Sequence, residues 1–332
     1  MNRSEYKNIW ILAEHTDGGL LPVYYELLSK AKELAGKTRG TKVCGIVLGY
    51  GVNHMIDKVA ESGADVVYSV DHAKLKDYNC DYYAKMLEAM IKTYKPESFL
   101  IGATSVGSEL APTIAAKVKT GVAAHCVDVT INDSGNLVCM VPAFGGKIVS
   151  EILVPNRRPQ IASVRSGILS ASKIPANANV EIIKCDSSVL DTFESGISLV
   201  DFKPNEVHGQ KLDQADIVVV AGRGVNTKEG WEHLQELAKR LNATIGNTRS
   251  FIDNGFVNDE STVIGTSGIS IKPKVCLAFG ASGAMHFVCG ILKSKMIISV
   301  NRDENAKLFD MTDCKVVSDA DKIIQALLQK LA

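Results

Sequence analysis

Short apolar runs alternate with amphipathic stretches along the first third of the chain. Runs of this length are typical of strands, and longer stretches in which apolar residues recur every three or four positions are typical of helices. The alternation predicts a parallel sheet covered by helices on both faces. The predicted strands are IWILA from residue 9, KVCGIVL from 42, DVVYSV from 65 and SFLIG from 98, and the predicted helices are 22–35, 54–62, 82–93 and 109–118, the last capped by Ser108.

After residue 121 the pattern changes to alternating apolar and polar positions. VDVTINDSGNLVCMV, from residue 127, predicts two strands around an Asp-Ser-Gly-Asn turn, and GGKIVSEILV and IASVR follow it. We expect these strands to form an antiparallel extension of the first domain. The polar segment 203–215 is typical of a linker, which predicts an N-terminal α/β domain at 1–202 and a second domain at 216–332.

The second domain repeats the order of strand and helix. Its predicted strands are IVVVAGRG from 217, ATIGN from 243, VCLAFG from 275 and MIISVN from 296, and its predicted helices are 228–241, one starting at Ser282, and 319–331. The predicted fold class is therefore α/β, with two doubly wound domains, the first carrying the antiparallel extension and the second built on a parallel sheet.

The charge balance limits the partners. Lysine and arginine together number 37, as do aspartate and glutamate, so no basic excess favours nucleic acid or an anionic membrane. No apolar run is long enough for a membrane span or a signal peptide, and we expect a cytoplasmic chain without membrane insertion. The eight cysteines form no CxxC motif, so we expect free thiols in a reducing compartment and no metal site.

Glycines and short polar residues follow the strands of the second domain, where open parallel sheets bind their ligands. The turn at Ser282 and Gly283 offers a hydroxyl and accessible backbone amides, which suit the pyrophosphate of a dinucleotide. Gly222 and Gly224 form only GxG, and Thr227 replaces the last glycine of a complete dinucleotide fingerprint. The candidate binding residues are Gly222, Arg223, Gly224, Thr248, Arg249, Ser250, Gly265, Thr266, Ser267, Gly268, Gly280, Ser282, Gly283, Ala284, Asn301, Arg302 and Asp303.

These motifs resemble those of the α subunits of electron-transfer flavoproteins, the α/FixB family. GASGAMHF from residue 280 and VNRD from 300 stand where that family carries G-x-x-SGA-x-x-H and I-N-K-D. GRG from 222, TR from 248 and IGTSG from 264 are similar to its GRG, SR and IGQTG. GATSVGSELAPTIAAKVKTG from 102 and PAFGGKIVSEILVPNRRPQIASVRSG from 142 also resemble the family, so the similarity runs in order along almost the whole chain.

The resemblance implies an FAD-binding second domain and a heterodimer, in which the N-terminal domain forms a base with a β subunit. It implies electron transfer to or from an acyl-CoA dehydrogenase or reductase by an FAD domain that moves about the linker. Whether the complex bifurcates electrons stays open. By the same matching, Arg249 and Ser267 face the flavin, and the phosphates and adenosine lie near Arg223, Ser282, Gly283, Ala284, Asn301, Asp303 and Asp319.

Three positions depart from the family pattern. Thr266 stands for its glutamine, Ile269 for its lysine, and strict spacing places its flavin-facing histidine at Phe287. His286 comes one residue earlier, a rotation of about 100° on a helix. Either His286 reaches the flavin from a shifted position, or that end of the ring has no imidazole beside it.

These departures keep open a nucleotide-binding structural subunit without a redox-active flavin. A third possibility is a NAD-dependent dehydrogenase, which is disfavoured because the glycine fingerprint is incomplete and no acid–base pair follows it.

Overall fold

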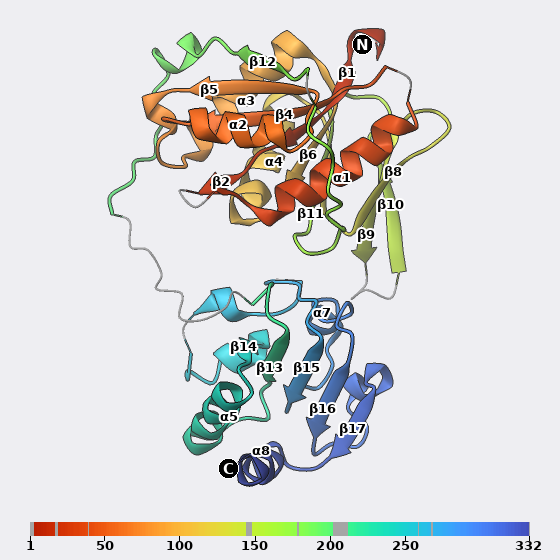
Figure 1. Cartoon of the computed structure of the whole chain (residues 1–332), viewed down its shortest axis with the longest axis vertical. Coiled ribbons are helices and arrows are strands. Elements are labelled where there is room, and N and C mark those ends of the chain that lie inside the picture. Colours follow the sequence, from red (N-terminus) through yellow and green to blue (C-terminus); the bar gives the residue numbers. More distant parts are fainter. Residues whose placement is uncertain are drawn as a thin grey trace. The chain divides into compact units, whose positions relative to one another are not determined.

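The chain forms two compact units, each with its own hydrophobic cores (Figure 1). The computed structural model describes residues 3–16, 19–38, 40–143, 148–177, 179–201, 212–257, 259–266 and 268–331. We call the described residues up to 201 the N-terminal unit and those from 212 the C-terminal unit. Most of the predicted linker, 203–215, lies outside the described residues. Leu212 and Ala215, at its end, are buried in the core of the C-terminal unit.

The N-terminal unit is built on a parallel sheet of seven strands in the order β12-β5-β4-β1-β6-β11-β7. The predicted strands and helices of its first part are confirmed, with boundaries shifted by a few residues. The strands are β1 (Lys7–Leu12), β4 (Val43–Gly49), β5 (Val66–Asp71), β6 (Pro96–Gly102), β7 (Val122–Cys126), β11 (Gln160–Val164) and β12 (Glu181–Lys184), and the helices are α1 (Pro22–Gly36), α2 (Asn53–Glu61), α3 (Cys80–Tyr94) and α4 (Ser105–Lys117).

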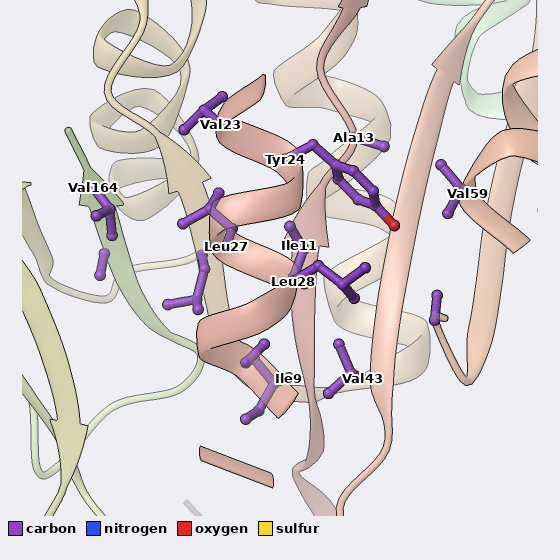
Figure 2. Close-up of a cluster of buried hydrophobic side chains, with 14 of the residues drawn as sticks. Ile9, Ile11, Ala13, Val23, Tyr24, Leu27, Leu28, Val43, Val59 and Val164 are labelled. Atoms are coloured by element: carbon purple, nitrogen blue, oxygen red, sulfur yellow. The ribbon is translucent and has the colours of Figure 1, made fainter. Parts of the chain in front are cut away.

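Alternate residues of the central strand β1 enter two separate cores. Ile9 and Ile11 pack with α1 and α2 on one face, and Figure 2 shows Leu27 and Leu28 of α1 beside Ile11. Trp10 packs with α3 and α4 on the other face. Burial on both faces explains why these strands are continuous apolar runs. The remaining short elements of this unit are the hairpin strands β2 (His15–Thr16) and β3 (Gly19–Leu20) and the 3-10 turns η1 (Arg3–Glu5), η2 (Ala73–Leu75) and η4 (Ser188–Leu190).

Helix α4 begins one turn earlier than predicted. Its N-cap is Thr104, whose hydroxyl accepts a hydrogen bond from the Gly107 N–H at 3.0 Å, and not Ser108. Prolines are common in the first turn of a helix, so Pro112 led to a predicted helix start close to it. In the structure Pro112 lies in the interior of α4. The N-terminus of α4 therefore lies directly after β6, at the carboxyl edge of the sheet.

The antiparallel extension has three strands, and the predicted place of IASVR in it is wrong. β8 (Asp128–Ile131), β9 (Leu137–Ala143) and β10 (Ile148–Leu153) pair in the order β10-β9-β8. IASVR supplies most of β11, which pairs in parallel with β6 and β7 inside the main sheet. A short buried run looks alike in both kinds of sheet, so the sequence pattern could not choose between them.

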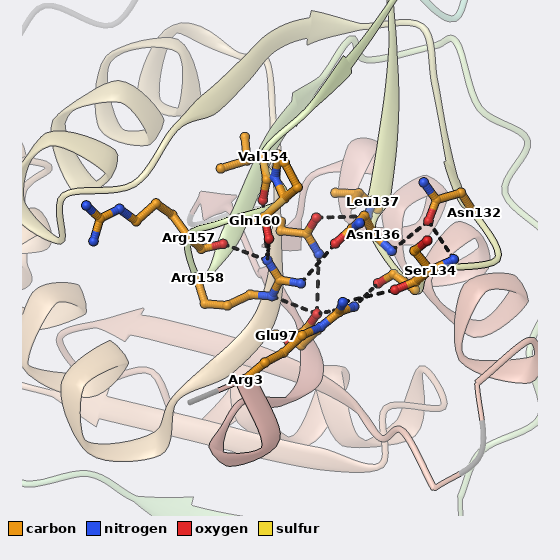
Figure 3. A network of polar contacts seen from close by, with 12 residues as sticks. Arg3, Glu97, Asn132, Ser134, Asn136, Leu137, Val154, Arg157, Arg158 and Gln160 are labelled. Carbon is orange, nitrogen blue, oxygen red and sulfur yellow. Dashed lines mark hydrogen bonds and ion pairs between the residues drawn. The ribbon is translucent and has the colours of Figure 1, made fainter. Parts of the chain in front are cut away.

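A buried arginine joins the extension to the main sheet (Figure 3). Arg158 is 5% exposed, and its Nε lies 2.7 Å from Oε1 of Glu97, the second residue of β6. Its Nη2 donates to the Asn136 side-chain carbonyl at 3.1 Å, beside the turn before β9. Gln160 accepts a hydrogen bond from the Leu137 N–H at 2.9 Å. The network lies where β6 and β11 begin, at the edge opposite the carboxyl ends of the strands.

The C-terminal unit has a parallel five-stranded sheet in the order β14-β13-β15-β16-β17 (Figure 1). The α/β class with doubly wound sheets is thus confirmed, although β17 was not predicted. No helix in the described ranges is long and apolar enough to cross a membrane. The elements are β13 (Ile217–Ala221), α5 (Lys228–Arg240), β14 (Thr244–Asn247), α6 (Arg249–Ile252), η5 (Glu260–Thr262), β15 (Val275–Phe279), α7 (Met285–Val288), β16 (Ile297–Asn301), η6 (Lys307–Met311), β17 (Cys314–Val317) and α8 (Ala320–Lys330).

Candidate functional site

The strand order of the C-terminal sheet reverses between β13 and β15. β14, which follows β13 in sequence, lies on one side of it, while β15, β16 and β17 extend from the other side. Ligands of open parallel sheets bind at such a switch point, because the loops after its two strands run to opposite faces of the sheet. Here these are the loops 222–224 and 280–284.

The two switch-point loops touch through their backbones. The Gly224 N–H donates to the Gly280 carbonyl at 3.0 Å. A Cβ on Gly222 would lie 2.4 Å from the Ala281 nitrogen, and a Cβ on Gly280, whose φ is +67°, would lie 2.6 Å from the Gly224 Cα. Contact between the loops therefore requires all three glycines, whether or not a ligand also approaches them.

The segment after Gly280 presents backbone amides but does not begin a helix. The predicted helix start at Ser282 is wrong, because α7 begins at Met285 and spans four residues. Gly283 has φ +82°, and a Cβ there would lie 2.1 Å from the Leu308 nitrogen. Within the described chain, no acceptor takes the N–H groups of Ser282, Gly283 and Ala284. Such a run of amides is suited to an anion.

Asn301 and the aspartates brace the same edge of the sheet. The Asn301 Nδ2 donates to the Ala281 carbonyl at 2.9 Å, and its Oδ1 accepts from the Asp303 N–H at 3.0 Å. Asp319 caps α8, because its Oδ1 accepts from the Asp321 N–H at 3.0 Å. Asn301 thus also holds the loop that carries the amide segment, whereas Asp319 holds the start of α8.

The end of β14 places a second group of candidates at this edge. The Thr248 N–H donates to the Ala221 carbonyl at 2.9 Å, and the Thr248 and Ser250 hydroxyls are 3.3 Å apart. Sequence reasoning missed Asn247, which is 1% exposed and donates through Nδ2 to the Thr262 hydroxyl at 2.8 Å. Asn247 ends the apolar run ATIGN, and a polar residue at the end of a buried strand was the signal that could have drawn attention to it.

Thr266 and His286 bind each other. The Thr266 N–H donates to the His286 carbonyl at 2.8 Å, and the Thr266 hydroxyl is hydrogen-bonded to His286 Nδ1 at 2.9 Å. The His286 side chain is exposed, whereas Phe287 is 5% exposed and packs in the core. Of the two positions, only His286 can present its side chain to a ligand in this arrangement. Ser267 lies outside the described residues.

Two more glycines lie on either side of Thr266 in the chain and pack closely against their neighbours. A Cβ on Gly265, whose φ is +133°, would lie 2.3 Å from the His286 carbonyl oxygen. A Cβ on Gly268 would lie 2.0 Å from the Val263 carbonyl oxygen. Both glycines are therefore required for the loop to approach its neighbours.

Exposed arginines follow three of the strands. Arg223, Arg249 and Arg302 come directly after or close to the ends of β13, β14 and β16, so they share the carboxyl edge of the sheet. Asp303 and Asp319 follow β16 and β17 at the same edge. The edge thus combines cations and free amides for phosphates with carboxylates that can accept hydrogen bonds from sugar hydroxyls.

Two family models match the chain, each over a different part of it. The model described as "Electron transfer flavoprotein domain" matches residues 9–190, and that described as "Electron transfer flavoprotein FAD-binding domain" matches residues 211–292. The chain belongs to the electron-transfer flavoprotein α-subunit family. The second match covers the switch-point loops, the end of β14 and the Thr266–His286 pair.

Curated members of the family are similar over nearly the whole chain. The electron transfer flavoprotein subunit alpha of Clostridium acetobutylicum is 35% identical over 335 residues, covering 100% of this chain and 98% of the relative. That of Thermoanaerobacterium thermosaccharolyticum is 34% identical, covering 99% and 98%. The lactate dehydrogenase (NAD(+),ferredoxin) subunit LctC of Acetobacterium woodii is 34% identical, covering 99% of this chain and 78% of LctC.

Proposed function

We propose that this electron-transfer flavoprotein α chain binds one FAD non-covalently in its C-terminal unit. The observation that supports this most is the run of N–H groups at Ser282, Gly283 and Ala284, which have no acceptor in the described chain and lie at the switch point of the sheet. These amides would hold the pyrophosphate, with Arg223 nearby. The glycines around them allow the two switch-point loops to pack against each other.

The flavin end would lie toward Arg249, Thr266 and His286. Bound FAD would supply reversible electron transfer. The Arg249 guanidinium keeps its positive charge and would favour the negative charge that reduction adds to the ring. Thr266 fixes His286 Nδ1, which leaves Nε2 as the imidazole nitrogen available to a ligand.

The chain would form a heterodimer with a β subunit. The redox partners would be that subunit and a flavoprotein dehydrogenase. An acyl-CoA dehydrogenase or reductase is one such partner. The name of LctC adds a lactate dehydrogenase with NAD(+) and ferredoxin, and supports an electron-bifurcating complex as a second arrangement. In either, the FAD-carrying unit would move as a body about the segment between the units, because one flavin must approach two partners.

Co-expression of the chain with its β subunit tests the cofactor assignment. We expect the purified complex to show flavin absorption, and we expect one FAD per chain to be bound by the C-terminal unit. A truncation ending at Phe202 should be colourless, and residues 210–332 alone should retain FAD. Flavin in the first fragment and none in the second would contradict the assignment.

The alternative is a nucleotide-binding structural subunit with no redox-active flavin. It is favoured by the burial of Phe287, which leaves no imidazole at the family position, and by the replacements at Thr266 and Ile269. A purified complex that holds adenine nucleotide but shows no flavin bands would support it. NADH-dependent turnover by the chain alone would instead indicate a dehydrogenase.

A further inference from the structure

Asn247, at the end of β14, joins two loops of the C-terminal unit through its backbone. Its carbonyl accepts a hydrogen bond from the Ile264 N–H at 2.8 Å, and Asn247 forms an isolated parallel bridge with Val263. The candidate groups 248–250 and 265–266 begin directly after Asn247 and Ile264. The relative position of these two groups therefore depends on how firmly Asn247 holds the segment that ends at Ile264.

The side chain of Asn247 adds a contact whose direction is fixed. The Thr262 hydroxyl donates to the Asp259 carbonyl at 2.7 Å, and Nδ2 of Asn247 lies 2.8 Å from the same hydroxyl. A hydroxyl has one proton to donate, and a carbonyl can only accept. The Thr262 hydroxyl must therefore accept from Asn247. The amide nitrogen of Asn247 faces Thr262, and the amide oxygen points away from it.

The amide oxygen of Asn247 is left without a partner. The residue is 1% exposed, and among the described residues no donor reaches Oδ1. A buried polar atom without a partner costs about as much free energy as one hydrogen bond contributes, whereas an apolar side chain in the same place would avoid this cost. The amide at position 247 is therefore explained by what it positions, because its net contribution to stability is small.

We propose that Asn247 is a positioning residue, which sets the loop that carries Thr266 relative to the loop that carries Arg249. This assignment rests on the proposed function, in which both loops face the flavin end of FAD. The segment 262–264 that Asn247 holds leads to Thr266, and Thr266 in turn fixes the imidazole of His286. Asn247 thus acts on the flavin through these residues and does not touch it.

Two substitutions remove the side-chain contact from opposite sides. Thr262→Val replaces the accepting hydroxyl by a methyl group, and Asn247→Leu replaces the amide by an apolar group of similar size. Thr262→Ser keeps the hydroxyl and should restore the wild-type behaviour. Thr312→Val is the matched control, because the Thr312 hydroxyl also donates to a carbonyl, that of Leu308 at 2.7 Å, and lies 2.9 Å from the hydroxyl of the buried Ser299.

Three measurements are made on the full chain co-expressed with its β subunit. Hydrogen exchange followed by mass spectrometry measures how firmly residues 262–266 are held, redox titration measures the reduction potential of FAD, and absorbance measures FAD content. We expect exchange in 262–266 to rise about tenfold or more in Thr262→Val and Asn247→Leu, and in neither Thr262→Ser nor Thr312→Val.

FAD content should be the same in all of these proteins. The equilibrium constant for one-electron reduction of FAD should fall about threefold or more in Thr262→Val and Asn247→Leu, which is a shift of about 30 mV to lower potential. The double variant should match the single variants, because both substitutions remove the same contact. Thr312→Val should keep the wild-type potential.

Faster exchange in 262–266 with an unchanged potential would overturn the proposal, because Asn247 would then support only the fold. Unchanged exchange would overturn it as well, since the side-chain contact would not hold the segment. An equal shift of potential in Thr312→Val would show that loss of any buried hydroxyl has this effect, which also overturns it. A wild-type complex without FAD would instead contradict the proposed function, and the exchange measurement, which needs no flavin, separates the two failures.

Discussion

Thr266 and His286 hydrogen-bond to each other through both backbone and side chain, at 2.8 and 2.9 Å. Both residues depart from the family pattern, and they are in contact. The imidazole is thereby fixed at the surface of the C-terminal unit, while the neighbouring Phe287 is buried. Spacing alone placed the important position at Phe287, whereas the structure places the available imidazole at His286.

The first prediction concerns this pair. His286→Gln should lower the reduction potential of bound FAD by roughly 30–60 mV, because the imidazole donor that Thr266 fixes is replaced by a flexible amide. Thr266→Val should cause part of the same shift, and the double variant should match His286→Gln, because the two side chains act as a unit. Redox titration of the four proteins measures this. Additive shifts would mean that Thr266 acts independently of His286.

The second prediction concerns Arg249. Arg249→Ala should lower the potential of the bound FAD by roughly 50–100 mV, because a nearby cation favours the charge added on reduction. Arg249→Lys should recover part of the loss. Arg240→Ala is the control, since Arg240 lies on α5 in an ion pair with Glu236. A titration that does not distinguish Arg249→Ala from the control would place Arg249 outside the flavin site.

The third prediction concerns Glu14, which follows β1 and is 8% exposed. Its Oε2 accepts from the Thr104 hydroxyl at 2.6 Å, and its Oε1 has no partner in the described chain. Burial raises the pKa of Glu14 from 4.5 to about 7. The folded state therefore binds the proton more tightly than the unfolded state. The free energy of unfolding should fall by about 3 kcal/mol between pH 4.5 and pH 7 and level off above that.

Urea unfolding followed by Trp10 fluorescence in a Trp231→Phe background measures this dependence. Glu14→Gln should remove the fall, and its stability should exceed that of the wild type more at pH 8 than at pH 5. Glu151→Gln, at an exposed glutamate of β10, should keep the wild-type profile. A wild-type profile in Glu14→Gln would show that another group carries the dependence.

The fourth prediction concerns Arg158 and Glu97, which lie 2.7 Å apart (Figure 3). Arg158→Ala should lower the free energy of unfolding of the N-terminal unit by about 3 kcal/mol, because it removes the buried guanidinium that binds Asn136 and leaves the Glu97 carboxylate to Arg3 and Gln160. Arg157→Ala, at the exposed neighbour, should change it by less than about 0.5 kcal/mol. The Trp10 unfolding assay distinguishes them. Equal losses at the two arginines would mean that the buried pair contributes no more than a surface residue.

The sequence predicted most elements because their burial is local. β1, β4 and β13 are apolar runs, and α1 and α5 each have a periodic apolar face. Both patterns can be recognised in the sequence without knowing which elements lie beside them. β17 was missed because Cys314–Val317 is a short, largely exposed edge strand whose pairing with β16 is not written in its own pattern. The start of α7 was missed because Gly283 has φ +82° and packs closely against Leu308, so the helix begins only at Met285.

The sequence predicted which strand ends contribute to the candidate site, but not how these strand ends are arranged in space. Chain order shows that the loops 222–224 and 280–284 each follow a strand, which made Gly222 and Gly280 candidates. It does not show that β13 and β15 are neighbours at a switch point, because strand order depends on how the whole sheet assembles. Nor could it show that Asn301 holds Ala281, or that Asn247 holds Thr262.

By itself, the sequence determined the α/β class, the two-part organisation and the family to which the chain belongs, because periodicity and motif order are properties of the chain alone. Tertiary structure decided the rest. It placed IASVR in the main sheet, turned His286 outward and Phe287 inward, and buried Arg158 beside Glu97. Each of these depends on contacts between residues far apart in sequence, and a local pattern of apolar and polar residues carries no information about which distant partner a side chain meets.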